Sequence, residues 1–571
     1  MNFNFVTSFF QRFKNGSHRC TQESPRLGKQ RNSLERTVAI TRARDIHDSS
    51  KEILQQLDPF TSVAGLHVPQ LLIEVNKTAP THETLDTENF DLSSKKKTGD
   101  EFDDWEKDAA KVTTHAISNE LIVKMLRDDE LFGNAGPVFD FATKFVRKSC
   151  LFPLDDKIAF FKSEKDAIAC TEDLNLAPGL ACPETYNQWG DTSTDESFIH
   201  FFFNGMCAVG LAAQKETPKS GFGPFEVDMP IQNFEIRPGF RPSGARVNFG
   251  ADQKPTGIFD YANEKLVIPG DEDWESAKWL AKSTAFTLYT CREHLMWGHL
   301  IISNKATMAC TTNLPPSHPI RRLLTIFTFR TNTINDQAFA ALVPEVSTLH
   351  RATAFTYHAL VKVFEEAYKT SGVFEPFCDK KITPELQALF DQGKFPYFSE
   401  GNTFFEIVRK FVKGWLAKSG PASSDVATKA FYAELQTLNK GQAYILTDFS
   451  EEALVNAISQ TIFYVTAMNE IIGTIIDYAR VTNHGAGIRV VEGGVEADAQ
   501  AFLDNLMIVS VTGLKMPQRM KSYNHFFGEA ETWKKFVQDM EVQSRAVQEA
   551  NAKRVELKFF DPALFECSIS V

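Results

Sequence analysis

The sequence lacks several features that would assign a function class directly. No apolar stretch of about 20 residues is free of polar side chains, so a transmembrane helix is not predicted. The net charge of −12 provides no basic excess for phosphate contacts, which argues against nucleic acid as a partner. No P-loop, dinucleotide glycine fingerprint, HExxH or Gly-x-Ser-x-Gly motif occurs. The corresponding nucleotide-binding, zinc-protease and α/β-hydrolase classes are therefore not indicated.

Cysteine and phenylalanine usage set two further expectations. The nine cysteines form no CxxC pair and follow no regular spacing. This indicates a reduced intracellular chain with neither a disulfide framework nor a zinc site. The 49 phenylalanines supply much apolar area. They suit an interior that binds an apolar ligand, and they equally suit a core that is simply rich in phenylalanine.

The first 112 residues differ in composition from the rest of the chain. Residues 1–45 are basic, rich in hydroxyl groups and poor in acids, as an organelle transit peptide is, although a disordered tail fits as well. Residues 75–112 are polar and dense in charge, which predicts a linker. We therefore expect a disordered or targeting N-terminal segment and linker over residues 1–112 and one large domain over residues 113–571. The expected location is the cytoplasm, or an organelle if the N-terminus is a transit peptide.

The body of the chain is predicted to be mainly α-helical. Acidic residues from Asp271 to Glu275 stand where a helix should begin, because negative charge is stabilising at the positive end of the helix dipole. Asp448 and Glu451 have the spacing of a reciprocal capping pair. The apolar pattern predicts helices over residues 274–308, 349–369, 453–476 and 530–553, and short strands in the Pro- and Gly-rich stretch 222–268.

Two histidines lie inside the first of these helices, in the run Glu293-His-Leu-Met-Trp-Gly-His299. On a regular α-helix, five residues advance the side chain by about 140°, which would point His294 and His299 apart. A π-turn, which closes from residue i to i+5, would bring both rings onto one face. The spacing therefore predicts chelation only if the helix is locally widened. Two unrelated histidines are the alternative that spacing alone leaves open.

Further motifs accompany the histidine pair at definite spacings. Pro316-Ser-His-Pro-Ile-Arg-Arg-Leu-Leu324 follows it after a short gap, and the chain closes on Ser568-Ile-Ser-Val571. In this order the motifs resemble the core of the lipoxygenase family. The likeness covers most of residues 270–571 and extends more faintly back to about residue 120. Other segments that carry it are Trp274-x2-Ala-Lys278, Ala285-Phe-Thr-Leu-Tyr, Arg330-x4-Asn335 and Val509-Ser-Val-Thr-Gly-Leu-Lys.

The resemblance implies a metal site. In lipoxygenases, two histidines of one helix and the free carboxylate of the last residue hold a non-haem iron, which corresponds here to His294, His299 and Val571. Two imidazoles and a carboxylate with open positions suit ferrous iron, and the sequence does not distinguish iron from manganese. Chain ends usually fray. The Phe-rich run 559–565 lies just before the C-terminus of this chain, however, and favours a C-terminus that is buried in the core.

The sequence departs from the family at the third histidine. The lead-in Ile462-Phe-x-Val-Thr-Ala favours placing Asn469 at the histidine position and Gly473 at the following amide position. In the other register Asn469 is the amide and Val465, which cannot bind metal, takes the histidine position. One imidazole is absent under either register, and Ser303 stands where an acidic residue often follows the second histidine. The expected ligand set is therefore His294, His299, Asn469 and Val571, or the site binds no metal.

Other polar residues near these motifs have more ordinary interpretations. His318 precedes Pro319 and is expected to position the turn after the central helix. His484 lies in a Gly-rich turn from which it could act as a substitute ligand. The nearest cations are Arg321, Arg322 and Arg330, any of which could meet a fatty-acid carboxylate or form an ordinary salt bridge.

The resemblance implies a mainly α fold, a large helical lipoxygenase-like catalytic domain over residues 113–571 with long central metal-bearing helices and a few short strands. It implies a dioxygenase that adds O2 to polyunsaturated fatty acids to give lipid hydroperoxides, with iron, or manganese, as cofactor. The Phe-rich stretches 355–364 and 404–411 could line a substrate tunnel or belong to the core.

Several alternatives and partner expectations accompany this function. The alternatives are a catalytically inactive lipid-binding homologue and a hydroperoxide isomerase. Residues 1–112 lack the alternating pattern of the β-barrel that often precedes this domain in the family, so a peripheral membrane contact would have to arise otherwise. We expect a monomer whose partners are a polyunsaturated fatty acid and O2, with no nucleic acid.

Overall fold

The computed structural model describes the chain from Thr194 onward. The expectations for residues 1–112 therefore lie outside the described residues. The described range has gaps at residues 204, 215–222, 316–317, 329–330, 332–334, 336–347, 371–383, 385–386, 389–394, 419–423, 439–445, 474–488, 491, 493–530, 554–560, 564, 566–568 and 570–571.

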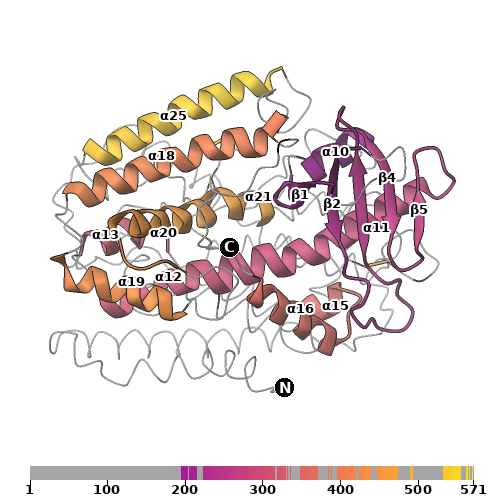
Figure 1. Ribbon diagram of the computed structural model, residues 1–571, viewed down its shortest axis with the longest axis horizontal. Coiled ribbons are helices and arrows are strands. Elements are labelled where there is room, and N and C mark those ends of the chain that lie inside the picture. Colours follow the sequence, from indigo (N-terminus) through magenta and orange to yellow (C-terminus); the bar gives the residue numbers. More distant parts are fainter. Residues whose placement is uncertain are drawn as a thin grey trace, which may run out of the picture.

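One long helical rod crosses the molecule from a small sheet at one end to the helices at the other (Figure 1). It consists of α11 (Trp274–Tyr289), the π-helical segment η2 (Thr290–Ser303) and α12 (Asn304–Asn313), which follow one another without a break. Most of the α11 side chains are buried, including those of Lys278 and Lys282. The helix predicted over residues 274–308 is confirmed.

The sheet is a five-stranded antiparallel meander whose strands lie in sequence order. The predicted short strands between residues 222 and 268 are confirmed, whereas β1 was not predicted. Helix α10 (Asp195–Phe203) packs against the sheet, since the ring of Phe203 lies edge-on to Phe249 at 4.7 Å. The strands are β1 (Leu211–Ala213), β2 (Phe225–Met229), β3 (Ala245–Phe249), β4 (Pro255–Asp260) and β5 (Lys265–Val267).

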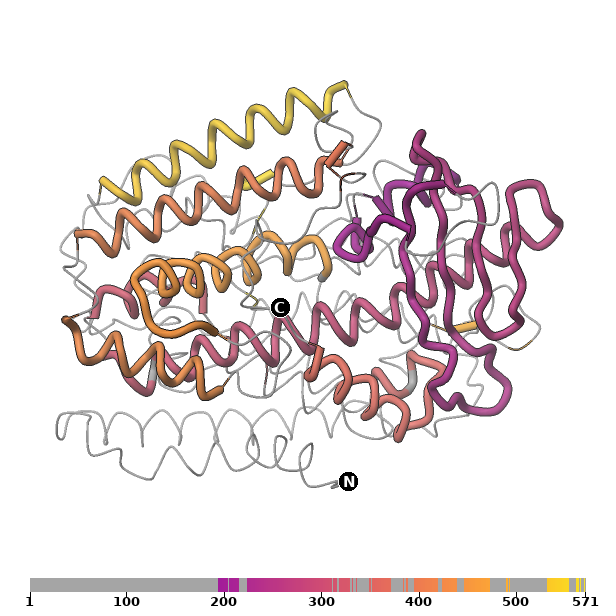
Figure 2. Tube along the Cα trace, in the orientation of Figure 1, coloured from indigo at the N-terminus to yellow at the C-terminus, as the bar shows by residue number. Residues whose placement is uncertain are grey.

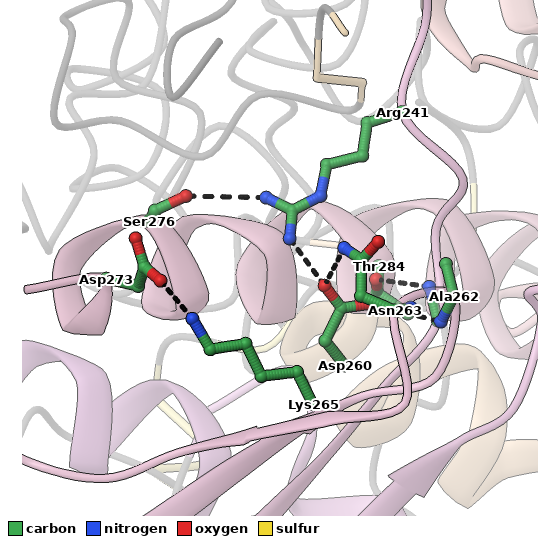
Figure 3. A network of polar contacts seen from close by, with 9 residues as sticks. Arg241, Asp260, Ala262, Asn263, Lys265, Asp273, Ser276 and Thr284 are labelled. Carbon is green, nitrogen blue, oxygen red and sulfur yellow. Dashed lines mark hydrogen bonds and ion pairs between the residues drawn. The ribbon is translucent and has the colours of Figure 1, made fainter. Parts of the chain in front are cut away.

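A polar network attaches this sheet to the start of α11 (Figure 3). Asp260 is buried at the end of β4 and accepts from Arg241 at 2.5 Å and from two backbone N–H groups of the turn that follows. Arg241 also donates to Ser276 of α11 at 3.3 Å. Lys265 and Asp273 form a second, exposed ion pair between β5 and the helix start. Because the buried carboxylate is fully supplied with donors, its burial is tolerated.

A second central helix packs against the rod and also contains a π-helical segment. It runs as α20 (Glu451–Phe463), η5 (Tyr464–Met468) and α21 (Asn469–Gly473), and the two π-helical segments contact each other. The predicted Asp448 cap is wrong, because the side chain of Ser450 accepts from the N–H of the third residue along. Serine directly before the helix satisfies the orphan donor more closely than the Asp two residues earlier.

Residues 349–369 form two helices, where the apolar pattern predicted one. α15 spans Thr348–Ala352 and α16 spans Tyr357–Lys369. Between them, Phe355 pairs with a distant backbone segment in an isolated β-bridge, and the Thr356 hydroxyl caps α16. The break depends on that distant partner, which local periodicity does not reveal.

Two long helices, α18 (Pro396–Lys418) and α25 (Glu531–Asn551), lie side by side over the second central helix (Figure 2). Their contact is aromatic: Phe411 and Phe536 stack with ring centroids 4.4 Å apart. The stretch 404–411 thus contributes to the core, and α25 confirms the helix predicted over residues 530–553. The remaining described elements include η1 (Ala208–Gly210), α13 (Pro319–Thr325) and α19 (Val426–Leu438).

The architecture confirms the mainly α fold class, with one small antiparallel sheet. Among the described helices, none is both long and apolar enough to cross a membrane.

Candidate metal site

The π-helical segment η2 brings the two predicted histidines together. The Nε2 atoms of His294 and His299 are 3.1 Å apart, and the ring planes meet at 78°. A regular α-helix would separate these side chains by about 140°, whereas the widened turn places both on one face. The local widening that the spacing required is therefore present. His299 is buried, and His294 is partly accessible.

Asn335 fixes the tautomer of His299. Its Nδ2 donates to the backbone carbonyl of His299 at 2.7 Å, and this contact sets which way the amide points. Its Oδ1 then faces Nδ1 of the imidazole at 3.2 Å and can only accept from it. The proton of neutral His299 consequently resides on Nδ1, and the lone pair of Nε2 points toward His294. A partner on the far nitrogen is a regular feature of metal-binding histidines.

Both imidazoles are held in the neutral form. Burial and, to a smaller extent, the neighbouring His299 lower the pKa of His294 to about 3, against a raising contribution from the amide of Asn469. Burial likewise lowers the pKa of His299 to about 4, against a raising contribution from Asn335. Neutral imidazole is the form that binds metals, so neither ring needs to lose a proton at neutral pH.

Asn469 stands beside this pair at the junction of η5 and α21. Its side chain is near enough to His294 to affect the pKa of that ring. Nevertheless, its Oδ1 atom is buried and has no hydrogen-bond partner of ordinary geometry in the part of the chain that the structure describes. A buried amide oxygen without a partner is costly. Val465, the alternative position in the other register, is 1% exposed and lies one turn earlier.

The separation of the two imidazoles fits a divalent transition metal. Two nitrogens that each lie about 2.1 Å from one metal, nearly at right angles, are about 3 Å apart, which matches the separation of His294 and His299. The amide oxygen of Asn469, whose side chain interacts with His294, is the third candidate donor. No cluster of three or more His, Cys, Asp or Glu side chains occurs among the described residues, so the group is two imidazoles and an amide. Val571 lies outside the described residues.

The segment that leads to Val571 is nevertheless buried where the structure describes it. Phe565 and Ile569 are 0% exposed, and the ring of Phe565 meets Phe404 of α18 edge-on at 5.1 Å. Two residues before its last position, the chain is therefore inside the core, as the Phe-rich run 559–565 indicated.

Sequence reasoning missed a buried ion pair next to the site. Arg292 donates to both carboxylate oxygens of Glu293 at 2.6–2.8 Å, and its guanidinium lies 5.5 Å from the ring of Tyr289 and 5.6 Å from that of Trp297. Glu293 is 3% exposed and directly precedes His294. Charged residues within an apolar helix were the available signal, since such residues are rarely buried unless paired.

The remaining predicted residues have structural roles where they are described. His318 caps α13, accepts from the N–H of Ile320 and lies 2.9 Å from Asp425, which confirms its role in the turn. Arg321 donates to the backbone carbonyl of Leu314 at 2.6 Å. Ser303 donates to the carbonyl of His299. Arg330 and His484 lie outside the described residues.

Comparison with known proteins identifies the fold. No protein-family model and no curated protein sequence matches the chain. Solved structures do match, among them a coral 8R-lipoxygenase with 15% identity and a TM-score of 0.62, covering 75% of this chain and 74% of that one. The manganese lipoxygenase of Gaeumannomyces graminis matches with 12% identity and a TM-score of 0.58, covering 80% of this chain and 93% of that one.

A third match is a LOX in an anaerobic crystal structure with arachidonate. It has 14% identity and a TM-score of 0.62, and the match covers 75% of this chain and 74% of that one. At these identities the likeness concerns the fold alone. This chain has the lipoxygenase fold, with a long central helix that contains a π-helical segment and a pair of histidines.

Proposed function

We propose that the protein is a non-haem metal dioxygenase that adds O2 to polyunsaturated fatty acids to give lipid hydroperoxides. The observation that carries this proposal is the convergence of His294, His299 and Asn469 at the centre of a lipoxygenase fold. The side chain of Asn469 interacts with the neutral His294, and its buried oxygen makes no hydrogen bond of ordinary geometry, which favours a metal site over an ordinary core contact.

The ligands we assign are His294, His299, the amide of Asn469 and the carboxylate of Val571. Iron or manganese bound there would supply the one-electron chemistry that starts the oxygenation of a pentadiene unit. Asn335 keeps the Nε2 lone pair of His299 aimed into the site. The surrounding apolar helices exclude water. No side chain has to act as a general acid or base, which agrees with imidazoles that stay neutral.

The proposed substrate class rests on two supports. A structural neighbour was crystallised with arachidonate, a polyunsaturated fatty acid. The segments that carry the site, η2 and η5, contribute apolar side chains to the buried core. Such an environment suits an uncharged pentadiene chain.

The first test is the metal content of the purified full-length protein. We expect near-stoichiometric iron or manganese in the unaltered chain, and little in His294→Ala, His299→Ala and a variant lacking Val571. Oxygen uptake with linoleate should follow the metal content. His358→Ala, which alters an exposed histidine of α16, serves as the control and should retain both.

Other outcomes would point elsewhere. A chain that binds fatty acid but holds no metal after reconstitution contradicts the dioxygenase and leaves the lipid-binding homologue. A metal-loaded chain that consumes lipid hydroperoxide without taking up O2 supports the isomerase instead.

Asn335 should matter for metal affinity although it does not touch the metal. We expect Asn335→Ala to weaken metal binding about tenfold, because without this partner neither the orientation of the His299 ring nor the position of its proton is fixed. The dissociation constant can be measured by competition with a chelator. Asn304→Ala, at another buried asparagine that follows η2 directly, is the control. An equal loss in both variants would mean that general destabilisation, and not ring orientation, is responsible.

A further inference from the structure

The inward face of α25 contains a polar notch that holds a carboxylate. The buried Ser544 and the exposed Gln548 at the rim of this face form the notch, and Met540 and Val547 beside it are buried. Asp561 lies in the notch and is 1% exposed. The Ser544 hydroxyl donates to Oδ1 at 2.6 Å, and the Gln548 amide donates to Oδ2 at 3.1 Å. Burying a carboxylate is costly unless such donors satisfy it, so the notch and the carboxylate form one built contact.

The same carboxylate shapes the chain that follows. Oδ1 of Asp561 also accepts from the backbone N–H of Ala563 at 3.0 Å, which closes a tight turn. Beyond this turn, Phe565 and Ile569 are both fully buried. Asp561 therefore fixes the turn that precedes the buried Phe565.

The buried end of the chain is in contact with the elements that carry the site. Phe565 packs on Phe404 of α18 at 5.1 Å, and Phe404 lies 6.1 Å from Phe463. Phe463 is the last residue of α20 before the π-helical segment that presents Asn469. A continuous row of aromatic rings thus joins the terminal segment to the helix beside the histidines.

We propose that Asp561 is a positioning residue that seats the C-terminal segment, and with it the carboxylate of Val571, beside the metal site. The inference rests on the proposed function for the role of that carboxylate, but the anchoring itself does not. Without the anchor, Phe565 and Ile569 still favour burial, so the fold should persist while the end of the chain opens more often.

The test is carried out on the full-length protein with Asp561→Ala and, independently, Ser544→Ala, which removes the same bond from the opposite partner. Asp539→Asn is the matched control, because Asp539 lies on α25 but pairs with the exposed Lys535. Release of the C-terminal residues by carboxypeptidase should be roughly tenfold to hundredfold faster in Asp561→Ala than in the control, and less so in Ser544→Ala. The iron-loaded variant should also lose metal to a chelator faster. Far-UV circular dichroism should be unchanged.

Each outcome decides between the two proposals. Faster release together with faster metal loss supports the positioning role. Faster release with an unaltered rate of metal loss overturns the positioning role and leaves only a structural clamp. Unchanged release in both variants overturns the anchor. If the unaltered chain holds no metal while release is still faster in Asp561→Ala, the anchor stands and the dioxygenase proposal fails.

Discussion

Replacing Asn469 by histidine should strengthen metal binding on the order of a hundredfold, because an imidazole is a better ligand for iron or manganese than a neutral amide. The substitution replaces the interaction of the Asn469 side chain with His294, and it breaks no hydrogen bond of ordinary geometry at the buried Oδ1 atom. Asn469→His would give the site three imidazoles, with a corresponding rise in the metal content of the protein as purified.

Val465→His is the variant that tests the alternative register. If Asn469 occupies the weak amide position, then histidine at position 465 supplies the missing imidazole and histidine at 469 adds nothing. Competition titrations with Fe2+ and Mn2+ on both variants separate the two cases. A dissociation constant that neither substitution improves, in a chain whose His299→Ala variant has lost the metal, would remove both positions from the ligand set.

The histidine pair could be predicted from sequence because its spacing and its partner motifs are local. The separation of five positions between His294 and His299 required a widened helix, and the motif at His318 made that helix part of the lipoxygenase resemblance. The structure contains the π-helical segment and brings the rings to 3.1 Å. The helix over residues 530–553 was equally predictable, because a single amphipathic period extends over its whole length.

The contacts that hold the site in place could not be predicted, because they join residues far apart in the chain. Asn335 was visible only as part of a motif, and its reciprocal pairing with His299 depends on how two segments fold back on each other. The break between α15 and α16 has the same origin, since Phe355 pairs with the segment at Ile236. Periodicity reports which face is buried, and it carries no information on which partner covers that face.

The environment of Lys305 should affect the stability of the protein strongly. It lies in the first turn of α12 and is 3% exposed, and its Nζ atom has no hydrogen-bond partner among the described residues. The titratable group that the structure places against it is Tyr368 of α16, whose ring centroid is 5.2 Å away. Burial lowers the pKa of Lys305 to about 7 from an ordinary value of 10.5.

This pKa fixes the sign of a pH dependence. Below pH 10.5 the unfolded chain binds the proton more readily than the folded one, so protonation favours unfolding. The unfavourable contribution of Lys305 to the free energy of unfolding grows as the pH falls from about 10.5 to about 7 and is constant below that, reaching on the order of 5 kcal/mol. The contribution of Lys305 alone should therefore make the free energy of unfolding rise between pH 7 and pH 10.

Lys305→Met should accordingly stabilise the protein at pH 7, with an apparent Tm higher by roughly 5 °C, since methionine fills a similar volume without a charge. The gain should shrink toward pH 10. Burial raises the pKa of Tyr and Cys residues such as Tyr289 and Cys291, so their contribution to stability falls as the pH rises toward 10. The quantity to measure is therefore the difference in Tm between the unaltered protein and Lys305→Met at each pH. Lys362→Met, at an exposed position of α16, is the control and should change little. An equal Tm difference at pH 7 and pH 10 would show that Lys305 gains from improved packing alone and keeps an ordinary pKa.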